Sequence, residues 1–282
     1  MHIRLATRGS ELALKQADMA SKFLKDKKPD WDFEIIAIKT SGDKRQDWSL
    51  EKLGGKGLFT KEIEDALLSG EADLAVHSAK DLPTTIADGL SIAGCLPREA
   101  CSDVLATRSD VQIPSLIATG SPRRRSQLKK IFPQAVWTEI RGNVPTRLKK
   151  IVDGLADATV LSKAGLDRLK ISEFDGIKFT ELKLDVCVPA AAQGFIALEC
   201  RSADLDIYAP LTDAFANEEF SLEREFLMKL GGGCQTPFAA NCQGDIFRFY
   251  HENCGIQKVR FPEGAKFADK LKTVGEIASS VL

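Results

Sequence analysis

The sequence contains few of the residues that characterise several large protein classes. It has three histidines, and its seven cysteines include no CxxC pair, which argues against a zinc site and against a disulfide framework. No stretch approaches the ~20 apolar residues that span a bilayer. The start of the chain, Met1-His2-Ile3-Arg4, has no apolar run after a basic segment, so we expect no secretory signal. Unpaired thiols suit a reducing compartment, and we expect a cytoplasmic protein that binds neither a metal nor a membrane.

Disorder and fibrous structure are also excluded by composition. Hydrophobic residues make up 44% of the 282 positions and charged residues 28%, without internal repeats or low-complexity segments. A chain of this length buries roughly three quarters of its extended surface on folding. We therefore expect an ordinary globular protein with two or three domains.

The formal net charge of −1 results from the cancellation of two unlike parts. Residues 121–150 carry nine basic side chains against a single acid, Glu139, so this segment has a charge of +8 and leaves −9 to the rest of the chain. The nine are Arg123, Arg124, Arg125, Lys129, Lys130, Arg141, Arg147, Lys149 and Lys150. A basic segment in an otherwise acidic protein predicts an anionic partner.

Hydrophobic periodicity predicts two units in which strands alternate with helices, followed by a smaller unit. Alternation of this kind favours crossovers onto a largely parallel sheet, with a return strand over 195–200. In the smaller unit Asn217 is the expected N-cap of a long helix that ends at Leu230, before antiparallel strands and a helix over 266–281. We predict an α/β protein of three domains. Their expected limits are 1–95 with 195–208, 98–190, and 213–282, the last of α+β type.

Several polar segments follow the predicted strands directly. In parallel α/β sheets ligands bind at this edge, beside the N-termini of the following helices. Arginine side chains near free helical N–H groups form an anion site. The segments are Thr7-Arg8-Gly9-Ser10, His77-Ser78-Ala79-Lys80-Asp81, Thr119-Gly120-Ser121-Pro122-Arg123-Arg124-Arg125 and Arg141-Gly142-Asn143 with Arg147. We predict anion-binding groups on two lobes that face each other across a cleft.

Plainer interpretations apply to several of these residues. The four lysines of the basic segment fit a solvated helix face equally well. Asp81 fits a helix cap as well as a group that stabilises a positive charge or carries a proton. His77 is better interpreted as a structural histidine. Contact with a nucleic-acid backbone is the rival explanation of the basic segment, but no interleaved aromatic residues support it.

Cys234 differs from the other cysteines because it follows three glycines at the end of a predicted helix. Such a loop exposes the sulfur and lets the backbone approach a ligand, although an exposed cysteine without a role is equally compatible. Five others lie in apolar, strand-like runs, where cysteine behaves as a small hydrophobe: Cys95, Cys101, Cys187, Cys200 and Cys242. Cys254 lies in a polar turn.

Taken together, and in this order, the motifs resemble those of the porphobilinogen deaminase (hydroxymethylbilane synthase) family over nearly the whole chain. They are Ala6-Thr7-Arg8-Gly9-Ser10, Gly54-Gly55-Lys56-Gly57-Leu58-Phe59, Ala75-Val76-His77-Ser78-Ala79-Lys80-Asp81-Leu82-Pro83, Arg141-Gly142-Asn143-Val144, Pro189-Ala190-Ala191-Ala192-Gln193-Gly194 and Gly232-Gly233-Cys234-Gln235. The resemblance implies two domains like those of periplasmic binding proteins around a cleft, in a monomeric transferase of tetrapyrrole (haem) biosynthesis. It also implies condensation of four porphobilinogen molecules into hydroxymethylbilane, with release of ammonia, on a covalent dipyrromethane cofactor.

The same resemblance implies roles for individual residues. Cys234 would carry the cofactor through a thioether, and Asp81 would be the catalytic carboxylate that assists loss of ammonia and stabilises an azafulvenium-type cation. Contacts with cofactor or substrate carboxylates would come from Arg8, Ser10, Lys80, Ser121, Arg123, Arg124, Arg141, Arg147 and Arg168. Lys52 and Phe59 would lie at or near a flexible active-site segment, and Gln193 at the hinge side of the cleft. The stretch over 43–57, polar and then glycine-rich, is the expected mobile lid over that cleft.

The chain departs from the family pattern at three places. Pro122 and Arg125 flank the Arg123-Arg124 pair, Ala100-Cys101-Ser102-Asp103 replaces an Asp-Pro-Arg-Asp-like run, and the third domain is short. Two other functions remain open from the residues themselves: a non-catalytic binding protein with two lobes, and a nucleic-acid binder.

Overall fold

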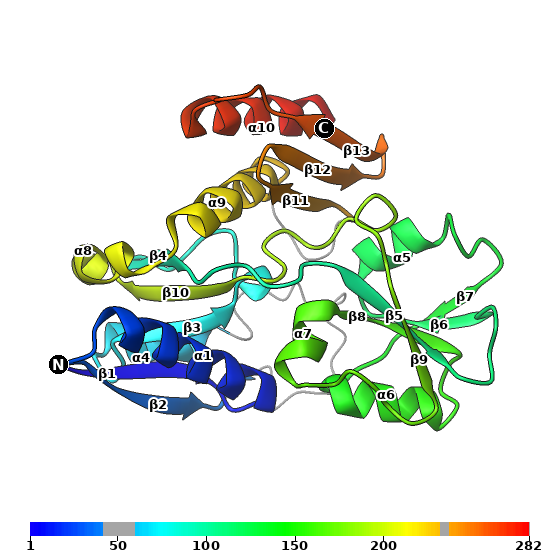
Figure 1. The fold of residues 1–282 in the computed structure, drawn as a ribbon, viewed down its shortest axis with the longest axis horizontal. Coiled ribbons are helices and arrows are strands. Elements are labelled where there is room, and N and C mark those ends of the chain that lie inside the picture. Colours follow the sequence, from blue (N-terminus) through cyan, green and yellow to red (C-terminus); the bar gives the residue numbers. More distant parts are fainter. Residues whose placement is uncertain (42–59, 232–236, 282) are drawn as a thin grey trace.

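Three separate sheets organise the computed structural model, which describes residues 1–41, 60–231 and 237–281. Figure 1 shows two α/β bodies side by side, with the last part of the chain packed above them. Two of the sheets have five strands and the third has three. The predicted class is confirmed as far as two α/β domains and a small α+β unit. The predicted domain limits stay a prediction.

The first sheet has the strand order β2-β1-β3-β10-β4. Its strands are β1 (His2–Arg8), β2 (Asp32–Ile38), β3 (Leu74–Ser78), β4 (Leu90–Cys95) and β10 (Ile196–Arg201). Helix α1 (Glu11–Lys27) covers one face and α4 (Lys61–Leu68) the other, each with a stripe of small and aliphatic side chains. The short elements are η1 (Ala79–Asp81), η2 (Ser202–Asp204), α8 (Leu205–Tyr208) and η3 (Ala209–Leu211).

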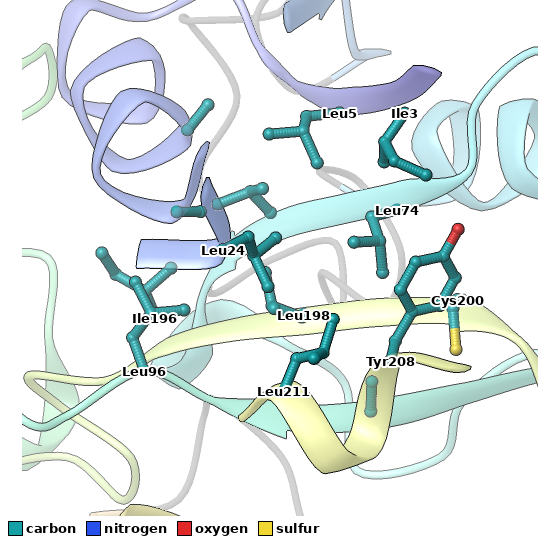
Figure 2. Packing of buried hydrophobic residues seen from close by; sticks show 14 residues of the cluster. Ile3, Leu5, Leu24, Leu74, Leu96, Ile196, Leu198, Cys200, Tyr208 and Leu211 are labelled. Carbon is teal, nitrogen blue, oxygen red and sulfur yellow. The ribbon is translucent and has the colours of Figure 1, made fainter. Parts of the chain in front are cut away.

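A continuous apolar core joins α1 to this sheet. Figure 2 shows Leu24 from the helix packed with Leu74 and Leu198 from two neighbouring strands, and Tyr208 closing one side. Each fully buried aliphatic side chain of this kind stabilises the fold by about 1.5–3 kcal/mol relative to an exposed one. This core makes the first lobe a rigid support for the loops at its sheet edge.

The second sheet repeats the arrangement of the first with the order β7-β6-β8-β5-β9. Its strands are β5 (Asp103–Arg108), β6 (Leu116–Ala118), β7 (Val136–Thr138), β8 (Ala158–Ser162) and β9 (Ile177–Glu181). The helices between them are α5 (Pro122–Leu128), α6 (Val144–Val152) and α7 (Lys163–Arg168).

In each of these sheets one strand runs against the others. These strands are β10, which overlaps the return strand predicted over 195–200, and β5. Each is antiparallel to both of its neighbours. Each directly follows a segment that crosses between the lobes. Consequently the first residue of β5, Asp103, lies opposite the last residue of β8, Ser162.

Two edge strands, β4 and β9, differ in how clearly the sequence marks them. The first contains Gly94 at φ +143°, beside a register shift in β10, and the second has only half-buried and exposed positions. The first segment therefore lacks a clear apolar alternation, whereas the second, Ile177-Lys178-Phe179-Thr180-Glu181, does alternate apolar and polar residues and is a strand signal that the sequence contains.

The third unit is an antiparallel sheet of the strands β11 (Ala239–Gln243), β12 (Ile246–His251) and β13 (Gly255–Arg260). Helices α9 (Ala214–Lys229) and α10 (Phe267–Val281) pack with it around the rings of Phe226, Phe247, Phe249 and Phe261.

The expectation that Asn217 caps the long helix is wrong. Helix α9 begins one turn earlier, where the Asp213 side chain accepts a hydrogen bond from Ala216 N. Asn217 instead accepts from Cys95 N at 2.7 Å, so its amide joins α9 to the end of β4. The Asn217 side chain, which the local sequence assigns to a helix cap, is therefore used in a tertiary contact.

Arg98 connects all three units at the crossing segment. Its guanidinium donates to both oxygens of Glu223 on α9, to the Cys242 carbonyl on β11, and twice to the Gln193 carbonyl. It also lies 4.3 Å from the centre of the Phe195 ring. The third unit is therefore fixed to the hinge between the two lobes.

Candidate active site

The polar motifs of the first lobe come together at the carboxyl ends of β1 and β3. Ser10 is the N-cap of α1, its hydroxyl accepting from Ala13 N at 3.3 Å, as its position after a strand predicts. A pocket at this edge is lined by Thr7, Arg8, Ser10, Leu12, Ala13, Gln16, Thr60, Val76, His77, Ser78 and Asp81. Its volume, about 80 Å³, is far below the ~300–1,000 Å³ of sites for whole drug-sized ligands, so it suits one arm of a ligand.

Asp81 and Lys80 form the polar end of β3. Asp81 is exposed at the end of η1, where its carboxylate borders the pocket. Lys80 donates to Gln193 Oε1 at 3.3 Å. Burial lowers the pKa of Lys80 to about 8, Asp81 and Asp103 oppose this shift, and Arg123 and Arg124 add to it. Lys80 of the first lobe thus lies within electrostatic reach of the arginines of the second.

Arg123 and Arg124 lie at the start of α5, which Ser121 caps through a bond from Arg124 N. Both side chains are more than nine-tenths buried and share the carboxylate of Asp103. Arg123 Nη1 is 2.7 Å from Oδ2, and Arg124 Nη2 is 2.6 Å from Oδ1. The two guanidinium groups hold the pKa of Asp103 well below its usual range, despite its burial.

Arg147 and Arg141 supply positive charge from the next crossover. Arg147 Nε donates to the Gly142 carbonyl at 2.7 Å. Burial, with Arg124 and Arg141 nearby, lowers the pKa of Arg147 to about 10, and Asp81 of the first lobe opposes that shift. The buried Nε of Arg141 has no hydrogen-bond partner within the described part of the chain. Free donors of this kind suit a carboxylate ligand.

The hinge takes the remaining two predicted site residues. Arg168 donates from Nε to Glu99 and from Nη2 to the Gly194 carbonyl at 2.8 Å, so its side chain faces the crossing segments. Gln193 Nε2 donates to the Cys101 carbonyl at 2.7 Å and to Asp103 Oδ1 at 3.0 Å. Gln193 therefore lies at the segments that cross between the lobes, and its role at the hinge side of a cleft stays a prediction.

The basic segment is divided by the fold into groups with different surroundings. Lys129, Lys130, Lys149 and Lys150 are exposed, in keeping with a solvated helix face. Arg125 donates to the Thr119 carbonyl at 3.3 Å.

His77 is the satisfied structural histidine that the sequence favours. Its Nε2 lies 2.9 Å from Glu199 Oε2, and both side chains are buried. The five cysteines of apolar runs are buried and Cys254 is exposed, as predicted.

Three predicted residues, Lys52, Phe59 and Cys234, lie outside the described residues, as does the predicted lid over 43–57. For all predicted site residues the roles stay a prediction.

Sequence reasoning missed the acids that hold the site together: Glu99, Asp103 and Glu223. The sequence indicates that Asp103 needs a charged partner, because it stands at the first position of a buried strand. It does not indicate which residue that partner is. The partner's identity depends on strand direction.

The family model and the relatives that match this chain carry the same family name. Residues 3–209 match the family model described as porphobilinogen deaminase, dipyromethane cofactor binding domain. The porphobilinogen deaminase of Lachnospira eligens is 44% identical over 254 residues, covering 86% of this chain and 84% of that protein. That of Listeria innocua is 41% identical over 257 residues, covering 88% and 83%. Among solved structures, the periplasmic VFT2 domain of Bordetella pertussis BvgS covers 79% of this chain and 92% of its own, with 18% identity and a TM-score of 0.47.

The match with the family model covers more than two thirds of this chain, and the two relatives match this chain over most of their own length. The part of the chain that the structure describes has no helix with the length and apolarity that a membrane span requires. This chain belongs to the porphobilinogen deaminase family.

Proposed function

We propose that this chain is a porphobilinogen deaminase, which joins four porphobilinogen molecules into hydroxymethylbilane with release of ammonia in tetrapyrrole biosynthesis. One observation carries the proposal: the Asp81 carboxylate borders a pocket together with Arg8, and it lies within electrostatic reach of Lys80 from its own lobe and Arg147 from the other. Porphobilinogen bears acetate and propionate arms and an aminomethyl group. A cluster of cations around one carboxylate matches that combination of charges.

The described residues fit a dipyrromethane cofactor, whose rings carry the same acidic arms. Arg141 offers an Nε without a partner among the described residues, and Arg8, Lys80 and Arg147 add positive charge around the pocket. We place the thioether at Cys234, which lies outside the described residues. When bound, the cofactor supplies the pyrrole carbon to which the first substrate ring is joined.

Asp81 is the proposed catalytic residue. Each coupling breaks the C–N bond of an aminomethyl group, and ammonia leaves with the electron pair. A C–C bond then forms, and the displaced ring proton is taken up by ammonia. A carboxylate beside the reacting carbon stabilises the cation that exists between these events and relays the proton. The surrounding arginines hold the acidic arms, so that the reacting carbons lie close together.

The intact mass of the purified protein tests this function directly. We expect an excess over the sequence mass equal to one dipyrromethane, present in the wild type and absent in Cys234→Ser. Cys254→Ser is the matched control, since Cys254 is an exposed cysteine elsewhere and should retain the adduct. An active protein without the adduct would contradict the assignment. A two-lobed binding protein would lack both adduct and ammonia release, and a nucleic-acid binder would show steep salt-dependent binding instead.

The role of Asp81 is tested by Asp81→Asn. This variant keeps the shape of the side chain and removes the charge, so we expect turnover to fall by at least about 10²-fold, as for other lost electrostatic groups. The adduct should remain in the intact mass. Turnover close to that of the wild type would reject a catalytic role.

We further propose a cytoplasmic monomer. Six described cysteines are unpaired thiols, five of them buried, which suits a reducing compartment. Size-exclusion chromatography with light scattering should give a mass near 30.8 kDa. A dimer at micromolar concentration would contradict this expectation.

A further inference from the structure

We propose that Asp103 is a positioning residue that holds the anion-binding groups of both lobes in one hydrogen-bonded network. This inference rests on the proposed function, because the groups it orients are those proposed to bind substrate carboxylates. The network runs from Lys80 through Gln193 to Asp103, and from there to Arg123 and Arg124.

The strand direction places Asp103 at the ligand edge. Asp103 is the first residue of β5, which is antiparallel to β8, and it lies opposite Ser162 at the carboxyl end of β8. Since β6 runs parallel to β8, the start of α5 after β6 lies at the same edge. A carboxylate is thereby buried, with no exposed surface, directly beneath the basic helix start.

The donors of the two arginines are used unequally. Arg124 commits all three nitrogens to the protein, with Nε and Nη2 on Asp103 Oδ1 and Nη1 on the Val160 carbonyl at 2.7 Å. For Arg123 the contacts within the described residues all end at Nη1, on Asp103 and on the Val188 carbonyl at 2.8 Å. Arg124 is therefore an anchor, and Arg123 retains Nε and Nη2 for a ligand.

The second branch of the network crosses the hinge. Gln193 Nε2 donates to Asp103, and this fixes the amide so that Oε1 accepts from Lys80 Nζ. The charged groups that act on Lys80 are Asp81 on its own segment and Asp103, Arg123 and Arg124 from the second lobe. Asp103 thus orients the guanidinium of Arg123 and contributes to the electrostatic surroundings of the Lys80 ammonium group.

Removing the charge of Asp103 should strengthen the electrostatic attraction of an anionic substrate but loosen the positions of Arg123 and Arg124. Asp103→Asn makes the cleft more positive, which favours an anionic substrate, while the arginine pair loses the carboxylate that fixes it. A shift of about 1 Å in a positioned group costs on the order of 10²-fold in rate. We expect kcat to fall about 10²-fold and KM to stay unchanged or fall. General loosening of the cleft would instead raise KM.

The titration of Lys80 gives a readout that does not require activity. Acylation of Lys80 by acetic anhydride, followed by peptide mass spectrometry across pH, reports the midpoint of its deprotonation. In Asp103→Asn this midpoint should shift to lower pH, because a neighbouring negative charge is lost. The matched control is Asp185→Asn, which removes an aspartate paired with Arg248 at 2.8 Å away from the cleft, and it should change neither readout.

An unchanged kcat, a raised KM, or an unchanged Lys80 midpoint would each overturn the proposal. If Asp103→Asn does not fold, Asp103→Glu retains the charge and displaces the carboxylate by one methylene. We then expect the wild-type Lys80 midpoint with a reduced kcat, and a wild-type kcat would overturn the proposal. A wild type without adduct or turnover would refute the proposed function alone, since the Lys80 midpoint still tests the network.

Discussion

Replacement of Arg98 by methionine should destabilise the whole protein, because this side chain joins the hinge to the third unit. Arg98 and Glu223 have side-chain exposures of 8% and 0%, and Nη1 lies 2.7 Å from Glu223 Oε1. Methionine fills a similar volume without a charge. Among the described residues, the variant leaves buried Glu223 with two N–H donors, from Ala192 at 2.6 Å and Cys242 at 2.7 Å.

The expected magnitude follows from the burial of the pair. Removing one partner of a buried ion pair costs about 3–5 kcal/mol, since the other charge is left without compensation. One kcal/mol shifts Tm by about 2–4 °C in a protein of this size class, so Arg98→Met should lower Tm by about 6–20 °C. Chemical denaturation should show a corresponding loss in the free energy of unfolding.

The pH dependence of the stability of Arg98→Met distinguishes an unpaired buried carboxylate at Glu223 from a loss of side-chain packing. Burial raises the pKa of Glu223, and Arg98 opposes that shift. Without Arg98 the pKa rises further, so the folded protein prefers the protonated carboxyl. A raised folded-state pKa of an acid means that stability is lost as pH rises. The deficit of Arg98→Met relative to the wild type should therefore be smaller at pH 5 than at pH 8.

Arg260→Met is the matched control, because Arg260 also pairs with an aspartate but has a side chain 67% exposed. Exposed pairs contribute about 0–1 kcal/mol, and we expect a correspondingly small change. Equal changes in Tm for the two variants, or a deficit of Arg98→Met that does not vary with pH, would refute the reasoning.

Two further predictions concern the cleft and the hinge. With a pKa of about 8, Lys80 loses its charge as pH rises through that value, so the KM for porphobilinogen should rise above pH 8. In Lys80→Arg the side chain stays charged, and KM should not change with pH over this range. A rise of KM in both the wild type and Lys80→Arg would assign the effect to another group. Gly194→Ala should cost at least about 2 kcal/mol by thermal denaturation, because φ is +97° and a Cβ would lie 2.7 Å from the Glu99 carbonyl oxygen. Gly154→Ala, at φ +87° with open space around it, should cost only about 1 kcal/mol, and similar losses at both sites would contradict a steric role for the hinge glycine.

Much of the fold follows from local patterns in the sequence. Strand–helix alternation identifies two α/β units, because each element must bury one apolar face and the spacing of apolar residues reveals that face. The caps Ser10 and Ser121 are found from residue type and position after a strand, since capping is a local interaction. The same local reasoning fails at Asn217, where a tertiary contact competes for the side chain.

The location of the cleft is likewise encoded in sequence order, because strand-end motifs gather at one edge of a parallel sheet whatever the details of packing. The sequence by itself therefore determined the class of fold, the presence of basic strand-end motifs on two lobes, and the family.

Only the tertiary structure decided which of those charges remain available. Asp103 neutralises part of the basic segment because β5 runs antiparallel to β8, and strand direction depends on long-range pairing that no local pattern contains. Glu99 and Glu223 meet Arg168 and Arg98 across 69 and 125 positions of the chain. Buried charges select their partners by proximity in space, so the charge balance of the cleft is a property of the fold.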